Sequence, residues 1–394
     1  MLPLLLLPLV VFGHVAAWVI VFNRFHALPL PRLYIKWTEK VIIAVTGAIP
    51  FVFWYLIDTG HIAVSSIDPS NLNHLVARSY FAFCSFVGVF ILIAWTVRKV
   101  TSAPLKMLLS NDTQVVDIAE ELGRRPIGRW TTAVFDRIPG SDMFSLATNE
   151  KKFALPQLAE RLDGLTIAHI SDLHFTGRIT KDFFIRVIEH VNRLDADIVA
   201  VTGDIVEKEH CLDWIPETLG KLESRFGSYF VLGNHDKRIR DVKALRELLV
   251  QSGLIDLGGR YLSLDIRGER VLFAGNELPW FGNLRQLTDQ RPSDIDEHAM
   301  RILLSHTPDQ IPWARRMRFD LMLAGHTHGG QIRFPIIGPI ISPSLFGVKY
   351  ASGVFFEPPT LMHVSRGISG LETIRINCLP ELTKLVLRTV DDPR

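Results

Sequence analysis

The sequence predicts an α/β domain preceded by an all-α region whose helices are able to span a membrane. Nearly all long uncharged runs of the 394 residues lie before residue 100, and most charged residues follow it. From Gly164 onward, short apolar and β-branched runs alternate with segments of helical periodicity, which is typical of α/β domains built around buried sheets. We therefore expect three parts: a transmembrane region over 1–100, a juxtamembrane linker over 101–158 and a folded domain over 159–394.

The first part contains three uncharged, mostly apolar runs, Leu2–Phe22, Val41–Ile57 and Ser79–Val97. A membrane-spanning helix needs about 20 apolar residues, with a range of about 17–25, so each run is long enough. Trp and Tyr residues lie inside or near their ends, as in interfacial aromatic belts. The alternative for the first run is a cleaved signal peptide, although it lacks a basic start and is long for one. The alternative for the second run is a buried core helix.

Basic residues in the loops predict the orientation of these runs. The loop from Asp58 to Arg78 carries two acidic residues and one cation, whereas the first and third runs are followed by clusters of cations, Arg24, Arg32, Lys36, Lys40, and Arg98, Lys99, Lys106. Because cationic loops favour the cytoplasmic side, we expect a multi-pass protein of the cell (inner) membrane. Its N-terminus would lie outside and its folded domain in the cytoplasm.

Two stretches of the linker carry their own patterns. Asp112–Gly123 places apolar residues on one side and acidic residues on the other, which predicts a short amphipathic helix. The stretch Gly123–Trp130 mixes arginines with Trp130. It either lies at the level of the lipid headgroups or is a plain solvated linker.

The folded domain shows seven runs typical of strands, at 165–170, 198–202, 229–232, 261–266, 270–274, 301–304 and 321–324. The fourth and fifth runs predict a hairpin that turns at Arg267-Gly268. Helical spacing predicts one helix from Thr180 through Leu194 and another over Asp241–Ser252, stopped by Gly253.

Polar residues follow five of these strands where each strand ends. They are Asp172 and His174, then Asp204, then Asn234, His235 and Asp236, then His306, and finally His326 and His328. Each motif alone is common, since a strand-end Asp usually caps a helix and a His-x-His pair usually lies in the core or at the surface. All five in order, with glycines beside three of them, predict one shared site, because ligands bind at the carboxyl ends of strands in open α/β sheets. Carboxylate, imidazole and amide ligands suit Mn, Fe, Zn, Co or Ni.

The ordered pattern D-x-H, G-D, G-N-H-D, H and G-H-x-H resembles the calcineurin-like metallophosphoesterase superfamily, over residues 160–390. The phrases LDGLTIAHISDLHF, GHTHGGQIRFP and HVSRGI…IRINCLPEL resemble one branch, which holds membrane-associated bacterial phosphodiesterases and relatives of UDP-2,3-diacylglucosamine pyrophosphatase. The resemblance implies a two-sheet sandwich flanked by helices and a metal-dependent hydrolase of phosphoric ester or pyrophosphate bonds. The stretch GISGLE, which follows Arg366, departs from the branch pattern.

The resemblance also implies a pair of divalent metal ions. The first ion would be bound by Asp172, His174 and His328, and the second by Asn234, His306 and His326, with Asp204 bridging both. A hydroxide between the ions would attack phosphorus in line. His235 would face the substrate and would stabilise the transition state or protonate the leaving oxygen. Glu207 stands where the family usually has Asp, as the carboxylate that orients this histidine.

The substrate that the resemblance implies is a phosphodiester or pyrophosphate in a lipid-linked molecule, such as UDP-2,3-diacylglucosamine in lipid A biosynthesis. One alternative is a general phosphodiesterase or phosphatase acting on phospholipid head groups, nucleotides or phosphoprotein. Another is a non-catalytic membrane receptor or transport component. Membrane lipids are the expected partners, whereas a net charge of +2 gives no reason to expect nucleic acid. The oligomeric state stays open.

Two further features complete the analysis. The apolar stretch Phe334–Phe356 predicts either a buried hairpin or an apolar lip that contacts lipid beside the site. The three cysteines, Cys84, Cys211 and Cys378, show neither a metal-binding spacing nor a disulfide framework.

Overall fold

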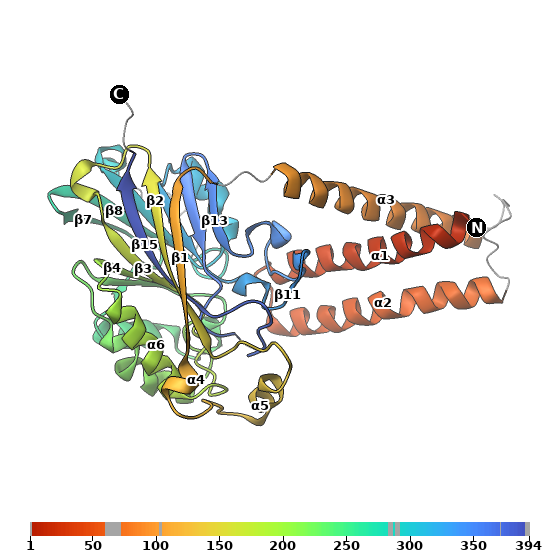
Figure 1. Ribbon diagram of the computed structural model, residues 1–394, viewed down its shortest axis with the longest axis horizontal. Coiled ribbons are helices and arrows are strands. Elements are labelled where there is room, and N and C mark those ends of the chain that lie inside the picture. The colour runs from red at the N-terminus through yellow and green to blue at the C-terminus, as the bar shows by residue number, and fades with distance from the viewer. Residues whose placement is uncertain are drawn as a thin grey trace. The chain divides into compact units, whose positions relative to one another are not determined.

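The computed structural model describes residues 2–59, 72–101, 105–282, 287, 292–370 and 372–390. The loop at 60–71, which carries Asp68 of the orientation argument, lies outside the described residues. The chain divides into two compact units, Met1–Pro104 and Leu105–Arg394, and each is described by itself (Figure 1).

The first unit consists, in its described part, of three helices: α1 (Leu2–His26), α2 (Arg32–Asp58) and α3 (Leu72–Thr101). Each contains a segment that is long and apolar enough to cross a membrane, at Leu7–His26, Arg32–Leu56 and His74–Val100. The prediction of three such helices is therefore confirmed.

Contacts between these helices are close. A Cβ atom on Gly13 of α1 would lie 1.8 Å from the carbonyl oxygen of Cys84 in α3, so only glycine allows this approach. The buried imidazole of His14 links α1 to the other two helices. Its ring nitrogens lie 2.5 Å from the Tyr80 hydroxyl and 2.9 Å from the Thr46 carbonyl oxygen.

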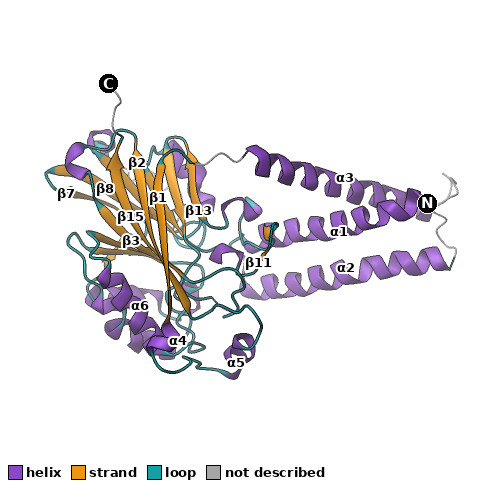
Figure 2. Ribbon diagram, viewed as in Figure 1, coloured by secondary structure: helices purple, strands orange, loops and turns teal. Residues whose placement is uncertain are grey.

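The second unit contains two large sheets and one short two-stranded pair in its described part (Figure 2). The first sheet has the order β1 (Leu108–Asp117), β2 (Ser145–Leu155), β15 (Glu381–Thr389), β3 (Thr166–Ile170), β4 (Ile198–Thr202), β5 (Ser228–Val231), β6 (Ile255–Asp256). The second has the order β13 (Gly353–Glu357), β14 (Thr360–Val364), β10 (Leu321–Ala324), β9 (Met300–Ser305), β8 (Glu269–Asn276), β7 (Tyr261–Ile266). The short pair is β11 (Arg333–Phe334) with β12 (Gly338–Pro339).

The sheets pack face to face, and helices cover their outer faces. Side chains from both sheets, such as Ile167, Tyr229 and Phe273, form the buried layer between them. The helices of this unit are α4 (Ile118–Glu121), α5 (Trp130–Asp136), α6 (Lys181–Arg193), α7 (Val242–Gln251) and α9 (Ile311–Arg316). Helix α6 packs on the outer face of the first sheet, and α9 packs on that of the second. The predicted two-sheet α/β sandwich flanked by helices is confirmed.

All seven predicted strands are present, displaced by at most two residues at an end. The runs were readable because β3, β4 and β5 are buried on both faces and pair in parallel, so most of their residues are apolar. The hairpin β7–β8 turns at Arg267-Gly268, where both residues have positive φ. Helix α7 begins after Asp241, whose carboxylate accepts a hydrogen bond from the amide of Ala244, and α6 follows Thr180.

The prediction of an amphipathic helix over 112–123 is wrong. Residues 108–117 form β1, which pairs antiparallel with β2, and only 118–121 are helical. Strand β1 lies at the edge of the sheet and is mostly exposed, so its own side chains carry little strand periodicity. Its pairing partner lies some 30 residues away, and local spacing does not reveal such a partner.

The linker assigned to 101–158 is also corrected, because the second unit begins at Leu105 and includes β1 and β2. The stretch before Trp130 is not a free linker, since the amide of Gly128 donates to the carbonyl oxygen of Arg178 at 2.8 Å. The buried-hairpin alternative for 334–356 is wrong as well. Its hairpin, β11–β12, leaves Phe334 48% and Ile336 78% exposed.

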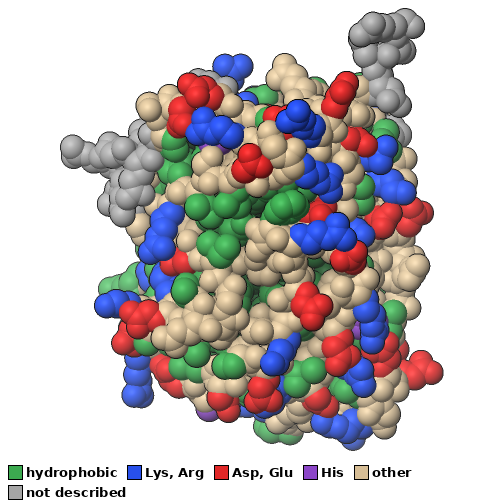
Figure 3. All heavy atoms as spheres, turned by 90° about the vertical axis from the view of Figure 1, so that its left-hand side faces the viewer, with side chains coloured by type: hydrophobic (Ala, Val, Ile, Leu, Met, Phe, Trp, Pro, Cys, Tyr) green, Lys and Arg blue, Asp and Glu red, His purple; other side chains and the backbone are tan. Residues whose placement is uncertain are grey.

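The face shown in Figure 3 carries acidic and basic side chains interspersed, with a group of hydrophobic side chains near its middle. This mixture matches the small net charge of +2 and offers no extended surface of one sign on that face.

Candidate functional site

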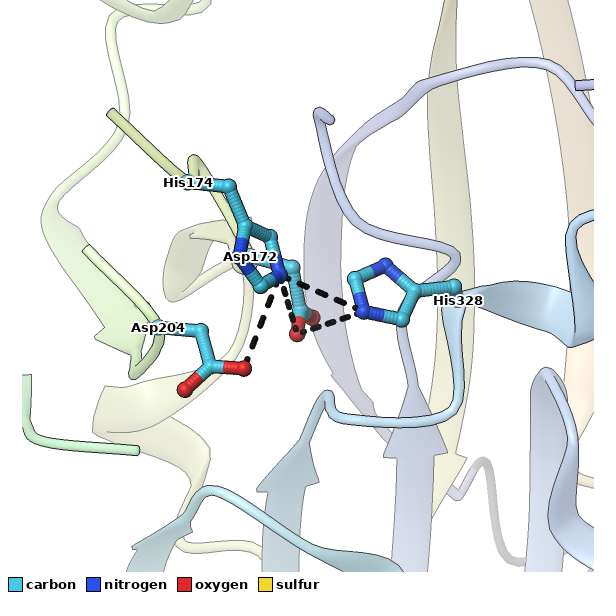
Figure 4. Close-up of side chains that lie close together, drawn as sticks. All are labelled: Asp172, His174, Asp204 and His328. Atoms are coloured by element: carbon cyan, nitrogen blue, oxygen red, sulfur yellow. Dashed lines mark hydrogen bonds and ion pairs between the residues drawn. The ribbon is translucent and has the colours of Figure 1, made fainter. Parts of the chain in front are cut away.

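The carboxyl ends of β3, β4, β5, β9 and β10 bring the predicted ligands together. Figure 4 shows Asp172 and His174, from the loop after β3, pointing toward Asp204 and His328, which come from two other loops. These four residues form one cluster whose ligand atoms all lie within 4.8 Å of one another, and Asp204, His306 and His326 form a second. The described residues therefore hold a candidate metal-binding site, with Asp204 common to both clusters.

The first cluster surrounds the Nε2 atom of His174. That atom lies 3.5 Å from Oδ2 of Asp204, 3.9 Å from Oδ1 of Asp172 and 3.3 Å from Nε2 of His328. Nε2 of His328 in turn lies 3.6 Å from Oδ1 of Asp172. Asp172 and His174 are fully buried, so no bulk water separates these atoms.

The second cluster surrounds the Nε2 atom of His306. It lies 3.3 Å from Oδ2 of Asp204, 3.0 Å from Oδ1 of Asn234 and 3.2 Å from Nδ1 of His326. Asn234 thus joins the group although it carries no charge. The Oδ2 atom of Asp204 faces both clusters, and among the described residues it is buried without a hydrogen-bond partner.

The tautomers of these histidines leave lone pairs facing one another. Nδ1 of His306 lies 2.8 Å from the carbonyl oxygen of Thr202, and Nδ1 of His328 lies 3.1 Å from that of Ser369. A carbonyl only accepts, so each Nδ1 carries a proton, and in the neutral ring each Nε2 presents a lone pair. Lone pairs that converge with a carboxylate oxygen repel one another unless a cation lies between them. This donor set therefore fits divalent metal ions.

Burial and neighbouring charges set the protonation of the site. Burial lowers the pKa of His328 well below 6.5, and His174 lowers it further, so this ligand is neutral. Burial also lowers the pKa of His306, but the Asp204 carboxylate outweighs it and raises the pKa to about 9. A metal ion bound at its Nε2 atom would therefore replace a proton. Burial raises the pKa of Asp204, yet His306 and His235 hold it well below its ordinary value. The carboxylate is thus ionised and surrounded by groups that compensate a single negative charge.

The loops that carry the ligands are strained. Five predicted ligands have φ between 49° and 71°, a region that non-glycine residues seldom adopt: Asp172, His174, Asp204, His326 and His328. Backbone hydrogen bonds hold two of these loops together, from the amide of Asp172 to Gly203 O at 3.0 Å and from that of His174 to Asp204 O at 2.9 Å. Such strain costs of order 1–3 kcal/mol per residue and gathers at functional sites.

Gly203 has a specific reason to be glycine. Its φ is +85°, and a Cβ atom there would lie 2.6 Å from Nδ1 of His306 and 2.8 Å from the amide nitrogen of Gly233. The loop after β4 therefore approaches the loops after β5 and β9 too closely for any side chain.

Glu207 contacts both a predicted metal ligand, His174, and the predicted catalytic residue His235. Its Oε1 atom is 2.5 Å from Nδ1 of His174 and 2.7 Å from Nδ1 of His235, and Arg238 pairs with its other oxygen. Burial raises the pKa of Glu207, but hydrogen bonds from the two histidines hold it far below its ordinary value. The sequence analysis expected Glu207 to orient His235, and the structure places it within hydrogen-bonding distance. Its contact with the ligand His174 was not anticipated.

Asp236 of the GNHD motif was named by the sequence analysis without a role. Its carboxylate accepts hydrogen bonds from the amides of Ile205, Val206 and Gly233, at 2.8–2.9 Å. It therefore pins the loop after β4 to the loop after β5. Burial raises its pKa to about 7, and the nearby charge of Asp204 adds to the shift.

Two positioning groups were missed by sequence reasoning. The first is Arg375, which is 1% exposed and donates to the carbonyl oxygens of Arg366, Gly367 and Ser369. Ser369 O is the acceptor that fixes His328, so the guanidinium holds the loop that sets this ligand's tautomer. An arginine within the apolar stretch IRINCLPEL was the available signal. The second is the carbonyl of Thr202, and a backbone acceptor gives no residue-type signal.

Comparison with known proteins agrees with this site. Residues 165–330 match the family model of the calcineurin-like phosphoesterases. The uncharacterized metallophosphoesterase YkuE of Bacillus subtilis is 29% identical over 253 residues, which cover 62% of this chain and 87% of that protein. The phosphodiesterase YaeI of Escherichia coli is 26% identical over 225 residues, covering 56% and 81%.

A vertebrate relative combines the same features. The transmembrane protein with metallophosphoesterase domain of Danio rerio is 29% identical over 256 residues, which cover 59% of this chain and 55% of that protein. The chain thus spans about half the length of this relative. With the family match and the clustered donors, these likenesses favour catalysis over the non-catalytic alternative. Residues 165–330 thus resemble the calcineurin-like phosphoesterases, and these likenesses support a metal-dependent phosphoester hydrolase.

Proposed function

We propose that this enzyme binds two divalent metal ions and hydrolyses a phosphodiester or pyrophosphate bond in a lipid-linked molecule at the membrane. The observation that carries the metal pair is the position of Asp204. Its Oδ2 atom is buried, lacks a hydrogen-bond partner among the described residues, and lies 3.5 Å and 3.3 Å from the lone-pair nitrogens of His174 and His306. One oxygen shared by two histidine clusters is the arrangement that a bridging carboxylate requires.

The ligands divide into two sets in this proposal. Asp172, His174 and His328 would hold one ion, and Asn234, His306 and His326 the other. When bound, the pair supplies a water of low pKa and neutralises the charge of the phosphoryl oxygens. The protein's own contribution is rigid geometry, since strained loops and the close backbone approach at Gly203 position most of the ligands before substrate arrives.

His235 is the proposed acid or electrostatic stabiliser. Glu207 accepts from its Nδ1 atom, so the Nε2 atom is directed elsewhere and is free to approach the leaving oxygen. The His235 side chain is 15% exposed, whereas the side chains of Glu207 and His174 are fully buried. It is therefore the accessible member of this group of three. Arg238 also contacts Glu207, through the oxygen that the two histidines leave free.

The lipid-linked substrate follows from the first unit. Three helices long enough to span a membrane hold the enzyme at a bilayer, where a phosphate ester borne by a lipid is presented. A freely diffusing substrate gains nothing from that location. The resemblance to relatives of UDP-2,3-diacylglucosamine pyrophosphatase names the first substrate to test. We place the enzyme in the inner membrane as a multi-pass protein with its catalytic unit in the cytoplasm, where a nucleotide-linked lipid is found.

The experiment uses the detergent-solubilised chain with Mn²⁺ and mass spectrometry of the products. UDP-2,3-diacylglucosamine, a phospholipid and bis-p-nitrophenyl phosphate are offered separately. The proposal expects UMP and a lipid monophosphate from the first substrate, with none formed by the Asp204→Asn variant. Cleavage of the phospholipid alone would keep the lipid substrate class and reassign the bond. Cleavage of bis-p-nitrophenyl phosphate without either lipid product would replace the proposal by a general phosphodiesterase.

A further inference from the structure

A short apolar hairpin lies directly against the loop that carries His328. Strands β11 and β12 form it, beginning five residues after this ligand. A Cβ atom on Gly330 would lie 2.4 Å from Cβ of Pro339, so the hairpin packs tightly on the ligand loop. Its tip nevertheless faces solvent, with Ile336 78% and Ile337 58% exposed. We define Arg333–Pro339 as the apolar hairpin.

The tip residue is unfavourable in water for two independent reasons. Ile336 has φ of 68°, and a β-branched residue in this region is a genuine outlier where glycine or asparagine is the usual choice. Its large apolar side chain is also the most exposed one in the hairpin. Neither folding nor solubility explains isoleucine at such a position, and an observed outlier of this kind points to function.

The segment that follows continues the same surface. Ile341 is 50% and Leu345 is 46% exposed. Two hydrogen bonds anchor the backbone of this segment. The Asp309 carboxylate accepts one from the Ser344 hydroxyl at 2.5 Å and one from the amide of Leu345 at 3.0 Å. Its exposed side chains therefore stand on an ordered backbone.

The charge of this region suits an anionic surface. From Gly329 to Phe356 the sequence contains no acidic residue. Arg333 and Lys349 carry positive charge, and Lys349 pairs with Glu357 at 2.7 Å. Exposed aliphatic side chains flanked by cations are typical of segments that enter the interface of an anionic bilayer. A soluble protein partner would not require the absence of acids over so long a stretch.

A short segment connects the last helix of the first unit to the second unit. Helix α3 ends at Thr101 and the second unit begins at Leu105. Four residue steps span at most about 14 Å even when fully extended. The second unit is therefore tethered to the end of α3 by only a few residues.

We propose that the apolar hairpin and residues 341–346 insert their side chains into the interfacial layer of a bilayer that contains anionic lipids. This inference rests on the membrane location in the proposed function and deepens it. Because the hairpin packs on the His328 loop, its insertion brings the metal site to the lipid–water interface, where the phosphate of a lipid-linked substrate lies.

The experiment reads the environment of the hairpin without measuring catalysis. All three native cysteines are buried, so a single introduced cysteine accepts a thiol-reactive NBD probe selectively. The full chain is labelled at Ile336→Cys, and separately at Ile337→Cys, then reconstituted into phosphatidylcholine–phosphatidylglycerol vesicles. The matched control is Val250→Cys on α7, a residue that is 49% exposed. Hydrolysis of bis-p-nitrophenyl phosphate verifies that each variant is folded.

We expect blue-shifted emission at both hairpin positions and quenching by lipid-borne nitroxide several-fold stronger than at position 250. Replacing phosphatidylglycerol by phosphatidylcholine should weaken the quenching if the cations contribute. Emission and quenching equal to those of the control would overturn the proposal. That result would leave the proposed reaction standing, whereas failure to cleave any lipid-linked substrate would leave the docking measurement unaffected.

Discussion

His174 donates the proton of its Nδ1 atom to Oε1 of Glu207 across 2.5 Å. The same oxygen lies 2.7 Å from Nδ1 of His235, so one buried carboxylate orients both a proposed metal ligand and the proposed acid. The two histidine rings lie edge to face, with centroids 4.8 Å apart. The same Glu207 oxygen therefore positions one histidine that is proposed to bind metal and another that is proposed to transfer a proton.

The first prediction follows from this shared atom. Glu207→Gln should lower both turnover and the affinity for the first ion, because an uncharged amide no longer stabilises the His174 tautomer that binds metal. Loss of such a partner typically costs 10–100-fold in metal affinity or activity. The measurement is metal content by mass spectrometry during dialysis against a weak chelator, together with steady-state kinetics. Unchanged metal retention would show that Glu207 serves His235 alone.

The second prediction concerns Asp204. Asp204→Asn should lose metal and nearly all turnover, because it removes the negative charge that two cations would share. Metal analysis should show fewer than two ions per chain in the variant and two in the parent. The neighbouring Asp236→Asn is a useful comparison, since among the described residues that carboxylate accepts hydrogen bonds from backbone amides and lies outside both ligand clusters. Two ions retained in Asp204→Asn would refute the bridging assignment.

The third prediction separates His235 from the ligands. His235→Ala should keep its metal ions but lose roughly 10²–10⁴-fold in turnover, the usual contribution of a positioned acid or base. If His235 protonates the leaving oxygen, the loss should shrink for substrates with good leaving groups. A uniform loss across leaving groups would assign it to transition-state stabilisation instead. Full activity in the variant would remove His235 from the mechanism.

The parts of the site that were predictable are those signalled by residue type. Strands such as β3 and β4 were readable because they are short, mostly apolar and buried on both faces. The ligands follow them at the sheet edge, so topology alone gathers them. The left-handed backbone at Asp172 and Asp204 was not readable, since nothing in an aspartate distinguishes a strained loop from a relaxed one.

The parts that were missed depend on long-range pairing or on backbone atoms. Strand β15 pairs with β2 in parallel, so that Glu381 lies opposite Ala147, more than 200 residues away. Without that partner, the residues of β2 show no local pattern that predicts a strand. The sequence therefore predicts a linker over residues 101–158. The carbonyls of Thr202 and Ser369 fix two ligands, yet every residue has such a carbonyl. Only the structure shows which ones serve the site.

The fourth prediction concerns a buried ion pair that joins β2 to β15. Glu381 accepts from Lys151 at 2.9 Å and from Asn149 at 2.7 Å, and Arg366 donates to its other oxygen at 3.1 Å. Glu381→Gln should destabilise the fold by about 3–5 kcal/mol, because it leaves the Lys151 ammonium buried without its counter-charge. Thermal unfolding of the detergent-solubilised chain measures the loss. Glu189→Gln, at an exposed pair on α6, should change stability little.

The same pair predicts the direction of a pH dependence. Burial raises the pKa of Glu381, but Lys151 and Arg366 outweigh it and hold the pKa well below 4.5. The ionised carboxylate therefore stabilises the fold above about pH 4.5, and this contribution is lost as the pH falls toward the folded-state pKa. The melting temperature of the parent should drop more steeply below pH 4.5 than that of Glu381→Gln. Parallel curves for the two proteins would contradict the assignment.

The last prediction concerns orientation in the membrane. The cation clusters that follow the first and third apolar runs should face the cytoplasm, and the segment from Asp58 to Arg78 should face the opposite side, since lysine and arginine near a span bias it inward. An alkaline phosphatase fused after Arg394 should be inactive because that reporter needs an oxidising compartment, whereas a fluorescent protein there should be fluorescent. The reporter inserted after Thr59 is the matched positive control and should be active. Activity after Arg394 would mean that the catalytic unit is exported, which would exclude a UDP-linked substrate and favour a phospholipid on the outer face.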